Sequence, residues 1–414
     1  MVEPGLQEEH CRVAIVGGGP AGLALAAELR RLSIGKVIVL ERESRAGGTP
    51  RHCGHYPFGL YEYMRLLKGP DYARRNLESA ILRGVEVRTD TTVTALQPDG
   101  VLEILNGKGR SILRADRVVL CTGVRESSRA QRFIGGDRPR GVVTTGALQS
   151  MVYLKGIKPF ERPVILGSEL VSLSAIQTAA HLGIKPVAIV EEENHLIARS
   201  ILRPYLTLKS IPLHLSATNP RILGQEKVEA LEYTNKDGSR QLIETDGIII
   251  SGRFRPEAAL LKASHLAVDA GTGGPDIDQF GRCTDPVYYA TGNLLRPAET
   301  SGYCWREGVE TARRIAADLN GSEFGTLSVS VHVADPAIRY VVPQRLTHAN
   351  GMDGMNRFYI SLKEPVNASL AIHGDQGQLW KRRLNARPVR RIEIPMIDPF
   401  RNGHTSAIHF SIQR

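Results

Sequence analysis

The glycine-rich turn Gly17–Gly22, with the sequence GGGPAG, constrains the fold more than any other part of the chain. It follows a short apolar run, Arg12–Val16, and precedes LALAAELRRL, a run of strong helix formers with helical spacing. KVIVLERE then predicts a second strand. A strand, a glycine turn, a helix and a strand within about 30 residues are typical of the βαβ unit that binds dinucleotides.

The glycines of this turn stand where a bound dinucleotide needs them. Gly17 permits the tight turn, Gly19 lets the backbone approach a pyrophosphate, and Gly22 lets the helix pack closely on the strand. The phosphates would then lie at the positive end of the helix. Glu41 ends the second strand, with the spacing of a carboxylate that accepts hydrogen bonds from a ribose hydroxyl.

A second copy of the pattern occurs at Arg162–Glu193, which indicates an internal duplication. Gly167 keeps the first glycine position, but Glu169 and Ser172 occupy the second and third. A side chain at the second position blocks the approach to a pyrophosphate, and a carboxylate adds like-charge repulsion. Glu191 keeps the ribose spacing, so weak binding stays open, but we expect poor use of NAD(P)H.

Two later segments bear on which nucleotide binds at the first site. RADRVVLCTG ends an apolar strand at Thr122-Gly123, and DPVYYATGN ends another at Gly292-Asn293. They resemble the two further flavin-binding motifs of the glutathione reductase and thioredoxin reductase superfamily, which implies FAD. In that superfamily an acidic residue of the last motif reaches the flavin ribityl chain and phosphate. Asn293 replaces it, which keeps hydrogen-bonding capacity and removes a negative charge.

After Asn320 the apolar runs become short and alternate with polar residues, a pattern typical of β-strands. The expected fold class is α/β, with two dinucleotide-binding (Rossmann-like) domains of the FAD/NAD(P)-binding type followed by a β-rich C-terminal domain. We expect an FAD-binding domain at residues 1–125 plus 282–325, an NAD(P)-binding-like domain with a degenerate glycine motif at 126–281, and the β-rich domain at 326–414.

The part of the chain before Asn320 resembles one branch of this superfamily. The stretches GGTPRHCGH, GSELVS, GRFRPEAALL and GRCTDPVYYATGN resemble the large flavoprotein subunits of hydrogen cyanide synthase, opine oxidase and related proline or hydroxyproline dehydrogenases. The resemblance implies a flavoprotein that receives electrons from a small donor and passes them to a partner. Those relatives often end in a cysteine-rich [2Fe–2S] domain, whereas this chain has no cysteine after Cys304, which leaves the electron route and the partner subunit open.

The loop GGTPRHCGHYPFG follows the first βαβ unit closely enough for its residues to reach a bound flavin ring. Arg51 could hold a substrate carboxylate or the flavin. His52 or His55 could accept the proton that leaves the donor as hydride goes to the flavin. The alternative is a structural loop whose polar residues bond one another or the FAD phosphate.

Cys53, in the same loop, is the remaining candidate for chemistry. It has no CxxC or CxxxxC partner, so a local dithiol cannot form, and a disulfide with distant Cys304 is a minor alternative. His52, Cys53 and His55 offer at most three ligands with no evident fourth, so we expect no metal site. The five cysteines of the chain are scattered, which fits a reducing compartment.

The sequence therefore predicts an FAD-dependent oxidoreductase, a dehydrogenase or oxidase subunit that oxidises a small amine, amino acid or hydroxy compound and passes electrons to a partner or quinone. The alternatives are an NAD(P)H-dependent electron-transfer reductase and a non-catalytic, flavin-bound assembly or redox-sensor subunit. The expected catalytic residues are Arg51, His52, Cys53 and His55. The expected cofactor-binding residues are Gly17, Gly19, Pro20, Ala21, Gly22, Glu41, Arg42, Gly48, Thr122, Gly123, Gly292 and Asn293.

Charge and hydropathy bear on partners and location. The net charge is +10, and over half of the surplus follows Leu327, densest in KRRLNARPVRR. Such a run could contact nucleic acid, anionic lipid or an acidic protein, but a solvated face is the favoured interpretation. We expect no nucleic-acid partner. No stretch reaches the roughly 18 to 20 apolar residues of a membrane span, so we expect a soluble, cytoplasmic protein, with peripheral membrane contact left open.

Overall fold

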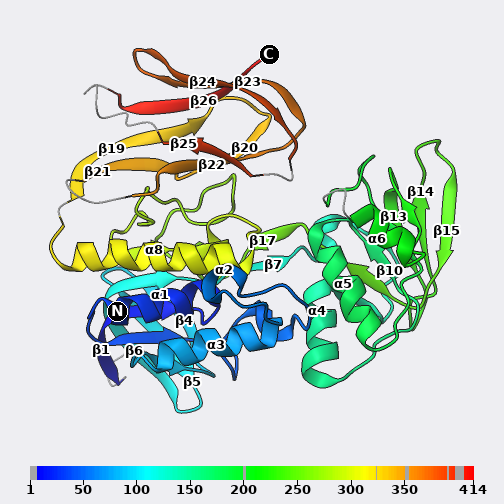
Figure 1. Ribbon diagram of the computed structural model, residues 1–414, viewed down its shortest axis with the longest axis horizontal. Helices are drawn as coiled ribbons and strands as arrows, with labels where there is room; N and C mark the ends of the chain where they lie inside the picture. The colour runs from blue at the N-terminus through cyan, green and yellow to red at the C-terminus, as the bar shows by residue number, and fades with distance from the viewer. Residues whose placement is uncertain (1–6, 199–201, 323, 350–353, 389–390, 397–404) are drawn as a thin grey trace. The chain divides into compact units, whose positions relative to one another are not determined.

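The computed structural model describes residues 7–198, 202–322, 324–349, 354–388, 391–396 and 405–414 (Figure 1). The chain divides into two compact units. Unit 1 comprises Met1–Gly48, Ala73–Val124 and Pro256–Arg414, and unit 2 comprises Thr49–Tyr72 and Arg125–Arg255. Within the described residues, no helix is long and apolar enough to cross a membrane.

Unit 1 contains a seven-stranded sheet in the order β3-β2-β1-β6-β5-β4, with β18 paired to β6. Its strands are β1 (Glu8–Val16), β2 (Val37–Leu40), β3 (Glu86–Arg88), β4 (Thr92–Gln97), β5 (Val101–Asn106), β6 (Gly109–Leu120) and β18 (Tyr288–Ala290). The pairs among β1, β2, β3, β6 and β18 are parallel, whereas β4, β5 and β6 form an antiparallel meander.

Both faces of the parallel part of this sheet are buried, because apolar side chains of β1 alternate between two cores. Val13 and Ile15 lie in the core formed with α1 and α8, and Ala14 and Val16 lie in the core on the other face. The helices with residues in unit 1 are α1 (Pro20–Arg31), α3 (Gly69–Ile81), α7 (Ala259–Lys262) and α8 (Ser301–Leu319), with the short 3₁₀ turn η4 (Gly292–Leu294).

Helices α1 and α8 lie side by side over the sheet (Figure 1). Gly308 of α8 allows this close approach, because a Cβ there would lie 2.3 Å from the carbonyl oxygen of Ala21 in α1. Helix α8 follows the strand and turn that carry Gly292. The packing of α1 and α8 therefore brings the first glycine motif and the last predicted flavin motif into one part of unit 1.

The C-terminal part of unit 1 is a β-sandwich. One sheet has the order β21-β19-β26-β23-β24, and the other has the order β20-β22-β25. Phe358 and Phe410 join the two sheets, with ring centroids 5.1 Å apart and an edge-to-face geometry. The strands are β19 (Phe324–Val333), β20 (Ile338–Val342), β21 (Arg345–Ala349), β22 (Arg357–Leu362), β23 (Val366–Gly374), β24 (Gly377–Ala386), β25 (Ile392–Pro395) and β26 (Ala407–Gln413).

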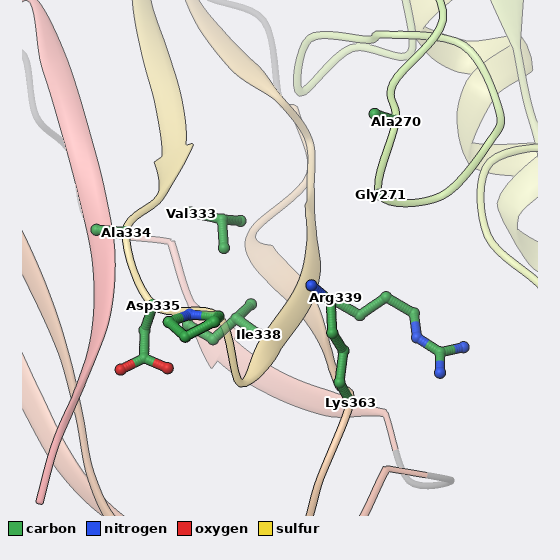
Figure 2. Close-up of a pocket in the computed structure, with 9 residues that line it drawn as sticks. Ala270, Gly271, Val333, Ala334, Asp335, Ile338, Arg339 and Lys363 are labelled. Atoms are coloured by element: carbon green, nitrogen blue, oxygen red, sulfur yellow. The ribbon is translucent and has the colours of Figure 1, made fainter.

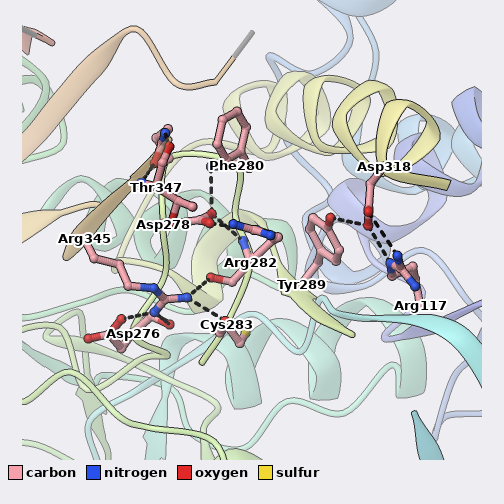
Figure 3. Close-up of polar contacts among 11 residues, drawn as sticks. Arg117, Asp276, Asp278, Phe280, Arg282, Cys283, Tyr289, Asp318, Arg345 and Thr347 are labelled. Carbon is pink, nitrogen blue, oxygen red and sulfur yellow. Dashed lines mark hydrogen bonds and ion pairs between the residues drawn. The ribbon is translucent and has the colours of Figure 1, made fainter. Parts of the chain in front are cut away.

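The sandwich is fastened to the segment that leads into β18 (Figure 3). Arg345 of β21 donates hydrogen bonds to the carbonyl oxygens of Arg282 (2.7 Å) and Cys283 (2.5 Å), and it pairs with Asp276. The backbone N–H of Thr347 donates to the side chain of Gln279 at 2.8 Å. The β-sandwich and the dinucleotide-binding sheet therefore share an interface rich in charge-assisted hydrogen bonds.

Unit 2 contains a five-stranded parallel sheet in the order β12-β11-β10-β16-β9 and a four-stranded sheet in the order β15-β14-β13-β8. Their strands are β8 (Gly135–Gly136), β9 (Val142–Thr144), β10 (Val164–Leu166), β11 (Ala188–Val190), β12 (Leu213–His214), β13 (Thr218–Leu223), β14 (Ala230–Thr234), β15 (Arg240–Glu244) and β16 (Ile248–Ile250). A further pair joins β7 (Val124–Glu126) to β17 (Phe254–Pro256).

The helical elements of unit 2 include a π-helical turn, η3 (Ser150–Leu154), which continues α4. The others are η1 (Thr49–His52), α2 (Leu60–Tyr63), η2 (Ala130–Arg132), α4 (Thr145–Gln149), α5 (Leu170–His181) and α6 (Leu202–Leu208). The chain thus has two α/β parts with parallel sheets and a strand-rich C-terminal end. The predicted fold class is confirmed. Unit 1 takes in residues 256–281, which the sequence pattern assigns to the second domain, and unit 2 takes in the loop after Gly48.

Candidate functional site

The turn between β1 and α1 requires two of its glycines for its own packing. Gly17 has a φ of +111°, and a Cβ there would lie 2.5 Å from the carbonyl oxygen of Cys121. A Cβ at Gly22 would lie 2.1 Å from the carbonyl oxygen of Gly17. These roles, a tight turn and close helix packing, are those that the motif predicts for its first and third glycines.

Gly19 has a different environment, because no atom of the described residues requires a glycine there. Its φ of −81° suits any residue, and the nearest atom to a Cβ would be the Cα of Gly48, at 3.9 Å. Gly19 is the N-cap of α1, which has no side-chain cap hydrogen bond, while Pro20 begins the helix. The turn therefore keeps open space beside uncapped N–H groups at the positive helix end, and these residues fit a pyrophosphate.

Glu41 holds the same turn from the end of β2. Its Oε2 accepts from the backbone N–H of Gly18 at 2.9 Å, and its Oε1 accepts from that of Glu43 at 3.0 Å. A carboxylate has about four acceptor positions, so capacity remains for a ribose hydroxyl. The neighbouring Arg42 is exposed.

The residues of the second predicted motif position a neighbouring segment. Thr122 Oγ1 donates to the carbonyl oxygen of Glu257 at 2.8 Å, and the N–H of Glu257 donates to the carbonyl oxygen of Gly123 at 2.9 Å. A Cβ at Gly123 would meet no atom of the described residues within 4 Å, but its φ of +74° favours glycine. Thr122-Gly123 therefore forms a turn with open space on its glycine side.

The third motif forms a turn that is closed by its own side chains. The N–H of Gly292 donates to Glu307 of α8 at 2.9 Å, and a Cβ at Gly292 would lie 2.8 Å from that of Ala21. The side chain of Asn293 bonds both backbone groups of Glu299: Oδ1 accepts from its N–H at 2.5 Å, and Nδ2 donates to its carbonyl oxygen at 3.1 Å. Asn293 thus shapes the loop after the motif.

The loop after β2 begins against the first glycine turn. The N–H of Gly47 donates to the carbonyl oxygen of Gly18 at 2.7 Å. Gly48 has a φ of +63°, and a Cβ there would lie 2.8 Å from the Cα of Gly19. Only glycine fits at Gly48, because its backbone crosses the Gly17–Gly22 turn at contact distance.

Cys53 is buried and remains a thiol. Its Sγ lies 3.4 Å from the carbonyl oxygen of Thr49 and 3.6 Å from Oε1 of Gln149 in α4. Burial raises its pKa to about 12, although the hydrogen bond to Gln149 opposes this. All five cysteines of the chain are buried and free. Because the thiolate is the reactive form of cysteine, Cys53 is a poor nucleophile at neutral pH.

Arg51, His52 and His55 lie close together along the chain and are each half-buried. Arg51 and His52 belong to the 3₁₀ turn η1. Nδ1 of His55 lies 3.0 Å from the carbonyl oxygen of Tyr56, and within the described residues its buried Nε2 has no hydrogen-bond partner. His55 is therefore held by one ring nitrogen, while the other is buried and has no hydrogen bond within the described residues.

The second nucleotide turn carries polar side chains at two positions where the first turn has glycines. Glu169 is the N-cap of α5, and its Oε1 accepts from the N–H of Arg253 at 2.7 Å. A Cβ added at Gly252 would lie 2.4 Å from the carboxyl carbon of Glu169. Burial raises the pKa of Glu169, although the bond from Arg253 opposes this. The carboxylate thus lies against Gly252 and Arg253 beside the turn, and it makes no cap hydrogen bond to the N-terminus of α5.

Ser172 and Glu191 are also hydrogen-bonded within unit 2. Oγ of Ser172 donates to the carbonyl oxygen of Gly167 and lies within hydrogen-bond distance of Oγ of Ser251, both at 2.8 Å. Glu191, which is 1% exposed, accepts from the N–H and the hydroxyl of Ser168 at 2.8 and 2.7 Å. The residue with ribose spacing is therefore buried and bonded within the protein.

Glu126 is a further candidate, which no sequence motif indicates. Its two carboxylate oxygens accept from the N–H of Gly146 (2.8 Å) and the N–H of Gly252 (3.1 Å), and burial raises its pKa despite these bonds. A carboxyl group with a perturbed pKa is a candidate for a functional site. The residues around Glu126 in the sequence form a short strand with no recognisable pattern, so no local signal could have identified it.

A shallow hollow of 580 Å³ lies apart from all these residues, on the sandwich side of unit 1 (Figure 2). It is lined by Asp335, Arg339 and Lys363 of the sandwich, together with Ala270 and Gly271. None of the predicted site residues lines it. The candidate cofactor site is therefore the set of turns around Gly19 in unit 1, whereas the loop residues Arg51, His52 and His55 belong to unit 2.

The parallel sheet, the glycine turn and the uncapped helix end define a dinucleotide-binding protein. The pyridine nucleotide-disulphide oxidoreductase profile matches residues 11–314, so the chain belongs to this family. Its members are FAD-dependent oxidoreductases, and this chain is an enzyme of that kind. The predicted cofactor and the predicted superfamily are confirmed.

Individual relatives are distant. An NADH oxidase of Methanocaldococcus jannaschii is 23% identical over 337 residues, covering 74% of this chain and 70% of that protein. The HcnB subunit of hydrogen cyanide synthase of Pseudomonas aeruginosa is 28% identical over 286 residues (63% and 57%), and an opine oxidase subunit of Rhizobium meliloti is 25% identical over 268 residues (62% and 56%). The matches thus span little more than half the length of these two subunits.

The similarity to solved structures concerns the fold. Thioredoxin reductase from T. acidophilum has a TM-score of 0.64 and 22% sequence identity, and the match covers 75% of this chain and 99% of that one. The uncovered quarter is consistent in size with the β-sandwich.

Proposed function

We propose that the protein is a flavin-dependent dehydrogenase or oxidase subunit that oxidises a small amine, amino acid or hydroxy compound and passes the electrons to a partner protein or a quinone. The observation that carries the proposal is the contrast between the two nucleotide turns. The turn at Gly19 has open space, whereas the corresponding turn of unit 2 carries the side chains of Glu169 and Ser172, which are hydrogen-bonded within the protein. This contrast is expected if the flavin receives its electrons from a donor other than a nicotinamide nucleotide.

When bound, FAD supplies the acceptor for a hydride from the donor. The turns at Gly17–Gly22 would hold its pyrophosphate, Glu41 its ribose, and the motifs at Thr122-Gly123 and Gly292-Asn293 the rest of the cofactor. The donor also loses a proton, which His52 or His55 accepts, while Arg51 binds a donor carboxylate. His55 is the better supported acceptor, because its Nε2 is buried and has no bond within the described residues.

Cys53 has no part in electron transfer in this proposal. Its raised pKa and the free state of the other four cysteines argue against a dithiol route. Two relatives, HcnB and the opine oxidase protein, are named as subunits, which supports a partner protein as the next electron carrier.

A second candidate is an NAD(P)H-dependent reductase, which the relative named NADH oxidase favours. In that case Glu169 would have to move away from Arg253 before a nicotinamide nucleotide could bind. The buried hydrogen bonds of Ser172 and Glu191 oppose such a rearrangement.

Anaerobic titration of the oxidised holoprotein tests the proposal. Amines, amino acids and hydroxy acids are added singly, and loss of the visible flavin absorbance reports reduction. The proposal predicts that at least one of these donors bleaches the flavin, and that the His55→Ala variant keeps the absorbance but is bleached more slowly. Rapid bleaching by NADH, with no effect of any small donor, would favour the reductase instead.

A further inference from the structure

The last predicted flavin motif is connected to a buried arginine in the loop that follows it. Nη2 of Arg296 donates to Oε1 of Glu307 at 2.8 Å, and the other oxygen of Glu307 accepts from the N–H of Gly292 at 2.9 Å. Arg296 is 2% exposed, and its Nε lies 3.5 Å from Glu299. Glu307 thus ties the glycine of the motif directly to a guanidinium group.

Residues of the β-sandwich hold this loop from the other side. The guanidinium of Arg296 lies 4.3 Å from the ring centroid of Tyr359 in β22. Arg391, the last residue of the basic run KRRLNARPVRR, has its Nη1 2.5 Å from Oε1 of Glu299. Its guanidinium lies 4.2 Å from the ring centroid of Tyr303 at the start of α8, and 5.0 Å from that of Tyr359.

These contacts form one connected cluster, in which Arg391 and Tyr359 are contributed by the sandwich. Two guanidinium groups, Arg296 and Arg391, oppose the carboxylates of Glu299 and Glu307. Glu393 of β25 adds a third carboxylate, with its Oε1 2.5 Å from Nη2 of Arg391. Burial lowers the pKa of Arg296, but Glu307 and Glu299 outweigh burial and raise it overall, so the group stays charged. For Arg391, burial likewise lowers the pKa, but the interaction with Glu299 outweighs burial and raises it overall.

The cluster is sensitive to the loss of any member. Removing one partner of a buried ion pair leaves an uncompensated charge, which is strongly unfavourable. Without Arg391, the described residues would leave Glu299 only the longer pairing with Arg296, and Glu393 would keep only its pairing with Arg357. The loop from Asn293 to Glu299 would then lose the positive charge that pairs with Glu299 at its far end. Its near end is the motif Gly292-Asn293, which faces the cofactor in this family.

We propose that Arg391 and Tyr359 are positioning residues for the flavin motif Gly292-Asn293, and that the β-sandwich serves as a clamp that sets FAD affinity. The clamp consists of Arg391 and Tyr359 acting on Arg296 and Glu299. This role gives the C-terminal domain a function in cofactor binding. This positioning role requires only that unit 1 binds FAD, and it does not depend on which donor the enzyme oxidises.

Equilibrium binding of FAD to the full-length apoprotein tests the clamp. Arg391→Ala should weaken FAD binding about tenfold or more, because the ordering of the motif is lost. Arg391→Lys, which keeps the charge but loses the flat contact with two rings, should fall between Arg391→Ala and the wild type. The matched control is Arg414→Ala, which removes an exposed pair with Glu364 in the same sandwich and should leave the FAD affinity unchanged.

Thermal unfolding of each apoprotein separates positioning from general stability. A purely structural role would lower the melting temperature of the Arg391→Ala apoprotein and leave its FAD dissociation constant within about twofold of the wild type, which would overturn the proposal. If Arg391→Ala does not fold, Arg391→Lys and Tyr359→Leu decide. Weaker FAD binding by both supports the clamp, and wild-type affinity in either one rejects it.

Discussion

The substitution Gly19→Ala separates cofactor binding from folding, because the structure leaves room for the added methyl group. The nearest protein atom to the new Cβ would be the Cα of Gly48, at 3.9 Å, which is an ordinary van der Waals distance. The backbone angles of Gly19, φ −81° and ψ −173°, are open to alanine. The cost to the folded apoprotein is then the weaker N-cap preference of alanine, about 1 kcal/mol or less.

Bound FAD would meet this methyl group directly. If the pyrophosphate lies against the turn at Gly19, it must move or the turn must yield, and overpacking of this kind costs about 1 to 3 kcal/mol. That cost corresponds to a dissociation constant for FAD raised about 5-fold to 150-fold. Gly19→Glu, with a longer and charged side chain, should abolish FAD binding.

The assay combines two measurements on each apoprotein, the melting temperature and the FAD dissociation constant from flavin fluorescence. Gly22→Ala is the contrasting variant, since its Cβ would lie 2.1 Å from the carbonyl oxygen of Gly17 and must disturb the fold without any ligand. Gly19→Ala with wild-type FAD affinity would refute the assignment of this turn to the pyrophosphate. A large fall in its apoprotein melting temperature would refute the claim that the space is open.

The loop after Gly48 gives the remaining predictions. Replacing with alanine whichever of His52 and His55 accepts the proton should leave FAD bound yet slow anaerobic reduction by the donor by about 10² to 10⁴, as expected for loss of a general base. Cys53→Ser should reduce the rate only mildly in the same assay, and a dead Cys53→Ser enzyme with fast histidine variants would show that thiol chemistry carries the reaction. Iodoacetamide should modify Cys53 about a thousandfold more slowly at pH 8 in the folded protein than in urea, because burial raises its pKa from 9.0 to about 12. Since the folded state holds this proton more tightly, the contribution of Cys53 to stability is complete below pH 9.0 and is lost as the pH rises toward about 12, which pH-dependent urea unfolding of wild type and Cys53→Ser would measure.

The glycine turns were predictable because their constraints are local. Gly17 and Gly22 are required by atoms within the same βαβ unit and its neighbouring strand, so a spacing rule captures them. The presence of Glu169 at the second glycine position was likewise visible in the sequence. Its hydrogen bond to Arg253 was not, because the two residues are 84 positions apart and only the parallel sheet of unit 2 brings them together.

The contacts of long polar side chains were harder to predict. For the basic run near the C-terminus, the prediction of a solvated face holds for Lys381, Arg382 and Arg383 of β24, all exposed. Arg391 instead has a side chain that is 16% exposed and pairs with Glu299. Periodicity predicts which residues of a strand face inward, but it cannot predict which distant carboxylate an arginine at a strand end will meet.

The central claim is that the second nucleotide turn no longer serves a nicotinamide nucleotide. Stopped-flow mixing of the anaerobic holoprotein with NADH, compared with the Glu169→Gly/Ser172→Gly variant, tests it most directly. We expect slow flavin reduction by NADH in the wild type, a faster reaction in the double variant as the turn reopens, and equal FAD content in both. A wild type that NADH reduces rapidly, at a rate that the double variant leaves unchanged, would contradict the claim.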